Sequence, residues 1–265
     1  MKDSGILLAN KRLVIKVGTA VLTQDGQLAI ERMNNLVNLI AKLKNEKNLE
    51  VILVSSGAVG AGFTTLKLDK RIIANKQALA AIGQPLLLKN YKKKFKEHNI
   101  TCAQMLFIAD DFDSRKRTKN AQNVMEILLE NNILPIINEN DVIANYELLF
   151  GDNDQLAAHV AYHFNADMLA ILSDIDGYYN KNPREYDDAV LQKEIFEIDP
   201  SELEMKHTAN SEFATGGIVT KLKAADFLMK NGIPMYLTSG FDLTNAYDFL
   251  LDGNHKSGTL FRIKK

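Results

Sequence analysis

A pair of glycines followed by a lysine is the part of this sequence whose residue types point most directly to chemistry. The segment Thr215-Gly216-Gly217-Ile218-Val219-Thr220-Lys221 opens a predicted helix over Ile218–Lys230. A bare backbone turn at the start of a helix presents N–H groups that bind phosphate. The G-x-x-x-x-G-K-[ST] spacing of the common nucleotide-binding loop occurs nowhere in the chain, so a nucleotide would be held by a different loop chemistry.

A second lysine stands beside a second glycine near the start of the chain, in Ile15-Lys16-Val17-Gly18-Thr19. The apolar strand predicted before Lys16 fixes the direction of its side chain, and Gly18 lets the backbone approach a phosphate. About two hundred residues separate Lys16 from Lys221, so the two lysines can meet only through the fold. Together they suggest a phosphate that passes between two anions.

The elements that must position these lysines alternate along the chain, with short apolar runs followed by longer segments of helical periodicity. This pattern predicts a three-layer α/β/α sandwich with a mainly parallel central sheet, because parallel strands need helical crossovers. The predicted strands are Arg12–Val17, Glu50–Ser55, Thr101–Phe107, Ile133–Asn138, Met168–Ser173 and Ile233–Thr238. The predicted helices are Ala29–Asn45, Asn75–Glu97, Arg115–Asn131, Asp154–Phe164 and Ile218–Lys230.

Polar residues follow three of the predicted strands. The segments at these strand ends are Ser56-Gly57-Ala58, Glu139-Asn140-Asp141 and Asp174-Ile175-Asp176-Gly177. Because the carboxyl ends of parallel strands lie at one edge of a sheet, these segments are expected to build one composite site. The long segment Asp174–Gly217 has only weak periodicity, and it is expected to build or cover that site.

Composition limits the class of protein and its partners. The 265 residues are 46% hydrophobic and contain no repeat or Gly/Ser-rich linker, so one continuous folded domain is expected. Lysine plus arginine number 32 against 33 acidic residues, which leaves no global positive field for nucleic acid or an anionic membrane. No signal peptide or membrane-spanning run is recognisable, and the single Cys102 is typical of a strand thiol in a reducing compartment. A soluble, cytoplasmic protein is predicted.

Six motifs, in order along the chain, resemble the amino acid kinase family, and within it the members that phosphorylate glutamate. The resemblance begins near residue 12 and runs to Lys265, without the C-terminal PUA domain that many members carry. Departures are mild: Ala20 stands where serine is common, Ser173 where threonine is usual, and Ile218-Val219 where Met-Ser is frequent. The motifs are Lys16-Val17-Gly18-Thr19, Val54-Ser55-Ser56-Gly57-Ala58, Lys76-Gln77-Ala78-Leu79-Ala80-Ala81-Ile82-Gly83-Gln84, Ile137-Asn138-Glu139-Asn140-Asp141, Gly151-Asp152-Asn153-Asp154 and Thr215-Gly216-Gly217 through Lys221.

The resemblance implies transfer of the γ-phosphoryl group of ATP to the γ-carboxylate of L-glutamate, which gives L-glutamyl 5-phosphate and ADP, the first step toward proline. A carboxylate with a pKa of about 4.3 is already ionised at neutral pH, so this nucleophile needs no general base. The reaction must bring one anion against another, which calls for positioned cations and backbone donors. Mg²⁺ is expected to bridge the β- and γ-phosphates, held more by nucleotide and water than by a protein cage.

The resemblance also implies roles for single residues. Lys16 would be the transition-state cation, Lys221 its counterpart on the nucleotide side, and Asp154 the carboxylate that holds both lysines. The competing interpretations are solvated lysines and a helix N-cap. The implied ATP-binding residues are Lys16, Gly18, Ser173, Asp174, Thr215, Gly216, Gly217 and Lys221. The implied glutamate-binding residues are Ser56, Gly57, Asn153 and, at the ammonium group, Asp141; the N-terminal part would mainly bind glutamate and the C-terminal part ATP.

Other interpretations stay open. The chain could be another family member, such as an acetylglutamate kinase, or a catalytically silent amino-acid sensor on the same fold, although the intact lysines disfavour the sensor. His159 and His163 stand at i, i+4 but lack the H-E-x-x-H glutamate and an obvious third ligand, so no protein metal site is expected. The resemblance alone implies feedback inhibition by proline and a homo-oligomer, dimer or tetramer.

Overall fold

Three strands are apolar runs buried along nearly their whole length, as expected when helices cover both faces of a parallel sheet. They are β1 (Arg12–Val17), β4 (Glu50–Ser55) and β7 (Met168–Ser173), and every residue of β7 is buried. All three have the bounds that the sequence predicts. The structure is a computed structural model that describes residues 11–144, 153–183, 185–204 and 217–264.

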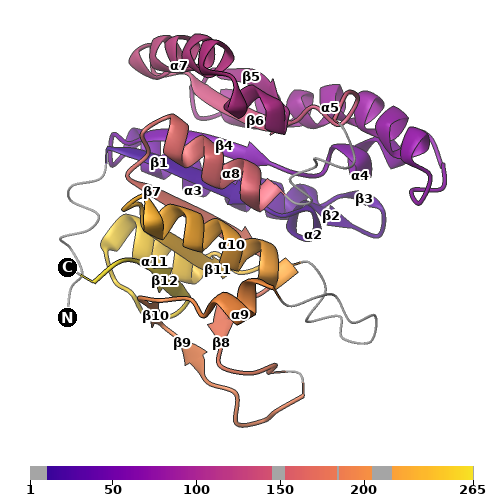
Figure 1. The fold of residues 1–265 in the computed structure, drawn as a ribbon. Helices are drawn as coiled ribbons and strands as arrows, with labels where there is room; N and C mark the ends of the chain where they lie inside the picture. Colours follow the sequence, from indigo (N-terminus) through magenta and orange to yellow (C-terminus); the bar gives the residue numbers. More distant parts are fainter. Residues whose placement is uncertain (1–10, 145–152, 184, 205–216, 265) are drawn as a thin grey trace. The chain divides into compact units, whose positions relative to one another are not determined.

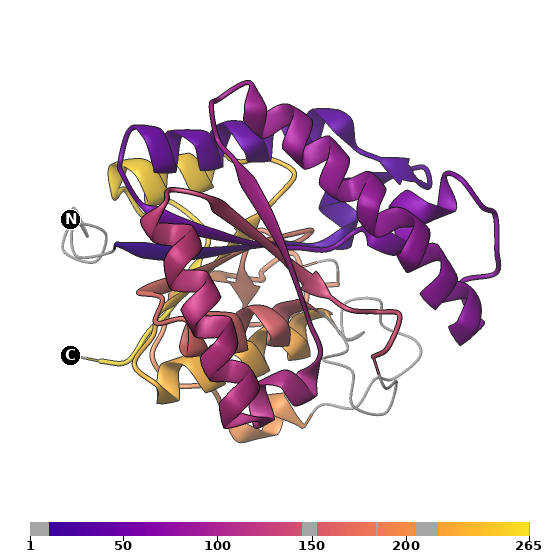
Figure 2. The ribbon, with the colours of Figure 1, turned by 90° about the horizontal axis from the view of Figure 1, so that it is seen from above.

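The chain divides into two compact units, and unit 1 contains Met1–Lys16 and Phe150–Lys265. Its strands lie in the order β10, β12, β11, β7 and β1; β11 is parallel to β7, whereas β12 is antiparallel to β11. Helices α8 and α10 lie on one face of these strands and α11 on the other (Figures 1 and 2). The bounds are β10 (Glu194–Ile195), β11 (Met235–Ser239), β12 (Thr259–Phe261), α8 (Asn153–His163), α10 (Gly217–Lys230) and α11 (Thr244–Asp252), with the shorter β8 (Tyr178–Tyr179), β9 (Leu191–Gln192) and α9 (Pro200–Leu203).

In unit 2, Val17–Leu149, parallel strands lie in the order β4, β6 and β5. Helices α3 and α5 pack against each other on one face of these strands, and α7 lies on the other (Figure 2). The predicted α/β/α sandwich with a mainly parallel sheet is therefore confirmed. The bounds are β5 (Cys102–Phe107), β6 (Leu134–Glu139), α3 (Ile30–Asn45), α5 (Ile73–Lys96) and α7 (Arg115–Glu130), with the shorter α2 (Thr19–Leu22), β2 (Thr23–Gln24), β3 (Gln27–Leu28), α4 (Ala58–Phe63) and α6 (Ala109–Asp113).

Helices α4 and α5 cross with their backbones in direct contact. A Cβ added at Gly62 would lie 1.9 Å from the carbonyl oxygen of Leu79, and one added at Gly83 would lie 1.7 Å from that of Ala58. Any side chain at either position would push the helices apart, so the crossing requires both glycines. Directly after this crossing, α5 contains Pro85, which has no N–H to donate within the helix.

The predicted elements end within two residues of the observed ones, but the prediction omitted several short elements. The prediction lacked α2, β2, β3, α4, α6, α11 and β12. The segment Asp174–Gly217, expected to be irregular, contains β8, β9, β10 and α9 among its described residues. The omitted helices are four to nine residues long, and the omitted strands have two or three residues. Elements of this length are too short to show a clear hydrophobic period in the sequence. The expectation of a single domain stays a prediction.

The single cysteine is a core residue, as the sequence predicts. Cys102 begins β5 and is 7% exposed. Burial raises the pKa of its thiol to about 12, although the nearby charges of Lys92 and Lys44 act in the opposite direction. The thiolate is the reactive form, so this thiol is inert at neutral pH.

Labelling with an aromatic disulfide reagent at pH 8 tests this assignment. We expect the native thiol to react at least about 100-fold more slowly than the thiol of the chain unfolded in guanidinium chloride, because the thiolate fraction is so small. The absorbance of the released thiol measures both rates. Equal rates in the native and unfolded chain would contradict the burial of Cys102.

Candidate active site

A single carboxylate holds two buried ammonium groups in unit 1. Oδ1 of Asp154 lies 2.5 Å from Nζ of Lys16, and Oδ2 lies 2.9 Å from Nζ of Lys221. The exposed fractions are 0% for Asp154, 2% for Lys16 and 3% for Lys221. The fold thus brings one residue each from α8, β1 and α10 to one point, in the pairing that the resemblance implies.

The first turns of α8 and α10 are tied together beside this cluster. Asp154 lies in the first turn of α8, where the helix dipole favours a carboxylate. Thr220 donates its hydroxyl hydrogen to Oδ2 of Asp154 at 3.1 Å, and Gln155 donates to the carbonyl oxygen of Thr220 at 2.8 Å. The ammonium group of Lys221 also donates to the carbonyl oxygen of Gly217 at 2.9 Å. These bonds fix the ammonium group in direction as well as in place.

The charge of the cluster suits an anionic ligand. Two ammonium groups and one carboxylate leave a net charge of +1, and the carboxylate separates two cations that would otherwise repel each other. Away from bulk water, Coulomb interactions are stronger than in solvent. A phosphoryl group beside the lysines would therefore be attracted to them, and charge that develops on its oxygens would be stabilised by fixed cations.

The other predicted nucleotide-binding residues of unit 1 also lie at element ends. Ser173 is the last residue of β7, is 3% exposed, and donates its hydroxyl hydrogen to Oδ1 of Asp174 at 2.9 Å. Gly217 is the first residue of α10, and among the described residues a Cβ added there would meet no neighbouring atom within 4 Å. None of the described residues therefore covers the start of α10 on that side.

The remaining residues predicted to bind the nucleotide are Gly18, Thr215 and Gly216. Gly18 has extended dihedral angles, φ −76° and ψ 157°, which any residue can adopt. Gly18 would therefore help a phosphate to approach because it has no side chain, and not because it adopts a conformation that only glycine allows. Thr215 and Gly216 lie outside the described residues.

The residues predicted to bind glutamate in unit 2 follow two neighbouring strands. Ser56 is 7% exposed and follows β4, and Gly57 has φ 98°, a left-handed angle that favours glycine, at the start of α4. β6 runs parallel to β4, with Ile137 opposite Val54, so the two strands end at the same edge. Asp141 follows β6 at that edge. The expected convergence of strand ends is therefore observed for β4 and β6.

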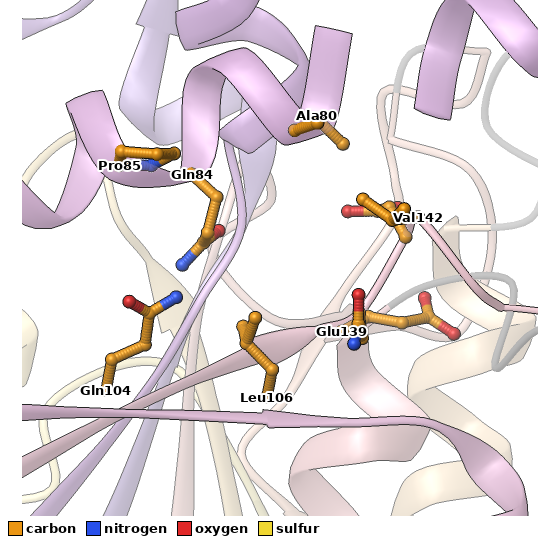
Figure 3. Close-up of a pocket in the computed structure, with 10 residues that line it drawn as sticks. Ala80, Gln84, Pro85, Gln104, Leu106, Glu139 and Val142 are labelled. Atoms are coloured by element: carbon orange, nitrogen blue, oxygen red, sulfur yellow. The ribbon is translucent and has the colours of Figure 1, made fainter. Parts of the chain in front are cut away.

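Asp141 lines a pocket of about 270 Å³ between α5, β5 and the loop after β6. Figure 3 shows the amide groups of Gln84 and Gln104 pointing toward one another across this space, one from α5 and one from β5. Burial raises the pKa of Asp141, and the neighbouring positive charge of Lys76 acts in the opposite direction. The pocket lining is Ala80, Ala81, Gln84, Pro85, Gln104, Leu106, Glu139, Asn140, Asp141 and Val142.

Asn153 belongs to a different unit from the other residues predicted to bind glutamate. It begins α8 in unit 1, next to Asp154, whereas Ser56, Gly57 and Asp141 belong to unit 2. The expectation that all four contact one glutamate stays a prediction. Sequence reasoning gave no role to Thr220 or Gln155; Thr220 lay inside a quoted motif, but Gln155 had no signal.

The histidine pair belongs to an aromatic cluster. The ring of His159 stacks on that of Phe227, with centroids 4.8 Å apart, and on that of His163 at 5.9 Å. Among the described residues, no three His, Cys, Asp or Glu side chains gather where they could hold a metal ion. Within the same residues, no helix is both long enough and apolar enough to cross a membrane.

The model of the amino acid kinase family matches residues 11–239. The chain belongs to the amino acid kinase family. This amino acid kinase is 56% identical to a glutamate 5-kinase from Wolinella succinogenes, across 95% of this chain and 97% of that protein. It is 52% identical to a glutamate 5-kinase from Leishmania donovani, across 97% of each chain. Similarity at this level extends along nearly the whole of both proteins.

Solved structures show that the fold of this amino acid kinase is shared more widely. A carbamate kinase from Giardia lamblia bound to AMP-PNP superposes with a TM-score of 0.66 at 19% identity, across 97% of this chain and 99% of that one. An isopentenyl phosphate kinase from T. acidophilum superposes with a TM-score of 0.63 at 15% identity, across 95% of this chain and all of the other. At such low identity, the likeness concerns the fold.

Removing the charge of the shared carboxylate tests the energetics of the cluster. We expect Asp154→Asn to lower the free energy of unfolding by about 3–5 kcal/mol, because it leaves two buried ammonium groups without their counter-charge. Urea denaturation followed by circular dichroism measures the change. The control is Asp226→Asn, which removes the carboxylate of an exposed pair with Lys230 and should cost at most about 0.5 kcal/mol. Equal costs would show that Asp154 is not the stabilising counter-charge.

Proposed function

We propose that this amino acid kinase catalyses ATP-dependent phosphorylation of the γ-carboxylate of L-glutamate, giving L-glutamyl 5-phosphate and ADP, the first step of proline biosynthesis. The observation that carries the reaction type is the pairing of Lys16 and Lys221 with one buried carboxylate. The substrate is supported by the similarity to glutamate 5-kinases over nearly the whole chain.

The cluster supplies what this reaction needs. An oxygen of the ionised γ-carboxylate bonds to the γ-phosphorus of ATP, while the bond between that phosphorus and the β,γ-bridging oxygen breaks and ADP leaves. No proton has to be removed from the nucleophile at neutral pH. Lys16 and Lys221 would place fixed positive charge beside the transferring group, and Asp154 would hold both in position.

The nucleotide is assigned to residues of unit 1 and to Gly18, which follows β1. Backbone N–H groups around Thr215–Gly217 and the ammonium groups would bind phosphates, Gly18 would allow close approach, and Ser173 with Asp174 would contact the nucleoside. Asp154 is already engaged by two lysines, so the residues fit a Mg²⁺ ion carried by ATP and water better than one held in a protein cage. When bound, the ion would neutralise charge on the β- and γ-phosphates.

Glutamate is assigned to residues that match its charges. Asp141 would accept hydrogen bonds from the α-ammonium group, and Ser56 with the N–H groups near Gly57 would donate to the α-carboxylate. Asn153 would contact the same substrate from the start of α8. A free α-ammonium group is then part of what is recognised, which disfavours N-acetylglutamate.

Two finer assignments rest on the family resemblance: assembly into a homodimer or homotetramer, and feedback inhibition by proline. A third, a cytoplasmic location, rests on the single cysteine, Cys102, which is typical of a reducing compartment. The near-neutral charge of the chain gives no reason to expect nucleic acid or a membrane surface as a partner.

Parallel assays with three acceptors test the function. The purified chain would be incubated with ATP, Mg²⁺ and either glutamate, N-acetylglutamate or aspartate, and ADP release would be followed by a coupled assay. Hydroxylamine would trap an acyl phosphate as a coloured hydroxamate. We expect ADP and hydroxamate with glutamate only. Preference for N-acetylglutamate would identify a different kinase of the family, and no turnover with any acceptor would favour the silent sensor.

Loss of one ammonium group should slow the chemical step. We expect Lys221→Ala to lower kcat by about 10²–10³, the usual cost of removing a preorganised electrostatic donor. The control is Lys223→Ala, two residues along the same helix and exposed, which should keep near-normal turnover. Steady-state kinetics with saturating ATP and glutamate measure both variants. Near-normal turnover of Lys221→Ala would reject its role.

Neutralising Asp141 should affect glutamate and spare ATP. We expect Asp141→Asn to raise the KM for glutamate by about 10- to 100-fold, the value of a hydrogen bond between charged groups, with the KM for ATP nearly unchanged. Because burial raises the pKa of Asp141, the wild-type KM for glutamate should also rise as the pH falls through that pKa and the carboxylate becomes neutral. Asp113→Asn, an exposed change in unit 2, is the control. An effect confined to ATP would contradict the assignment.

A further inference from the structure

Helix α5 contacts the chain at or directly beside both segments to which the proposed function assigns glutamate in unit 2. One segment is Ser56–Gly57, between β4 and α4, and the other is the loop after β6 that carries Asp141. Each segment is a short connection, so its position depends on what packs against it. The α5 residues that contact these segments or their flanking residues are Gln77, Gly83, Gln84 and Tyr91.

The first segment is held by α5 on both sides of Ser56–Gly57. The hydroxyl groups of Tyr91 and Ser55 lie 3.0 Å apart, and both residues are fully buried. On the other side, α4 begins at Ala58, whose carbonyl oxygen faces the hydrogen of Gly83 at a distance that excludes any side chain. The strand end and the helix start that flank the segment therefore move with α5.

The second segment is held through one buried amide. Asn138 is 2% exposed, and its Nδ2 donates to Oε1 of Gln84 at 2.8 Å. Its Oδ1 accepts from the backbone N–H of Glu139 at 2.9 Å. Since the oxygen of Asn138 is used by Glu139, only its NH₂ end can face the helix, and an acceptor is required there. Gln84 supplies that acceptor, and Gln77 adds a bond to the carbonyl oxygen of Val142 at 3.2 Å.

We propose that Gln84 is a positioning residue for glutamate, which acts by holding Asn138 and thereby the loop that carries Asp141. This inference rests on the proposed function. Gly83 and Gln84 are consecutive, so the turn of α5 that is locked onto α4 is the same turn that holds Asn138. The separation between the group for the α-carboxylate and the group for the α-ammonium is then set by one turn of helix.

Two replacements at position 84 separate the hydrogen bond from the shape of the side chain. Gln84→Met keeps the length but removes the acceptor, so the buried Asn138 loses the hydrogen bond that it donates to position 84. We expect it to raise the KM for glutamate by about 5- to 100-fold, with the KM for ATP within about twofold of wild type. Gln84→Glu keeps an acceptor oxygen, so its KM for glutamate should stay within about threefold of wild type at pH 8, where carboxylates are ionised.

A double-mutant cycle tests whether Gln84 acts through Asn138. Asn138→Asp removes the donor but keeps the acceptor for Glu139, and it should raise the KM for glutamate as Gln84→Met does. If both changes break one hydrogen bond, the double variant should be no worse than the worse single variant. Multiplying effects on KM would show that the two side chains act separately, and would overturn the proposal.

Gln104→Met is the matched control, because Gln104 presents an amide to the same pocket from β5 without a bond to the loop among the described contacts. Its KM for glutamate should stay near wild type. An equal effect at Gln84 and Gln104, or an unchanged KM in folded Gln84→Met, would overturn the proposal. Wild-type protein that does not phosphorylate glutamate would instead refute the proposed function, so the two failures are distinguishable.

Discussion

The pairing of one buried carboxylate with two buried ammonium groups is the interaction on which the site of unit 1 depends. Neither Lys16 nor Lys221 could remain charged and desolvated without a counter-charge, and Asp154 provides one for both. The arrangement also fixes three elements against each other, since the residues come from β1, α8 and α10. Stability of the fold and readiness for an anionic ligand therefore come from the same side chains.

In unit 2, direct backbone contact between two helices holds the predicted site residues in place, whereas in unit 1 a charge interaction does so. Gly62 and Gly83 let α4 and α5 approach until carbonyl oxygen and Cα are in contact, so the helix pair has little freedom to slide. The loops that carry Ser56 and Asp141 are attached to that rigid pair. Loops usually hold functional groups best when a stiff scaffold anchors both ends.

The strands that lead to the site could be predicted because each is an apolar run bounded by polar residues, as in Met168–Ser173. Helix α4 could not, because Gly60 and Gly62 disfavour a helix locally, and only its packing on α5 compensates. Helix α11 has nine residues and is followed by Gly253 with φ 67°, which is a helix stop signal. The signal was present in the sequence, but nine residues are too few for a clear helical period.

The candidate site could be predicted from the sequence only in part. Lys16 and Lys221 stood out by their glycines, but nothing in their spacing places both on Asp154; that pairing followed from the family resemblance. The hydrogen bonds that Thr220 donates to Asp154 and that Asn138 donates to Gln84 join side chains far apart in the sequence. Such bonds depend on how whole elements pack, so no local pattern announces them.

Pro85 removes one backbone hydrogen bond from the part of α5 that lines the pocket of unit 2. Without an N–H at position 85, the carbonyl oxygen of Ala81 has no partner in the helical hydrogen-bond ladder, and both residues line the pocket. Replacing Ala81 would leave this acceptor in place, because it belongs to the main chain. Only a change of the proline itself would restore a helical donor for this carbonyl oxygen, so the missing bond is encoded four residues away from the atom that lacks it.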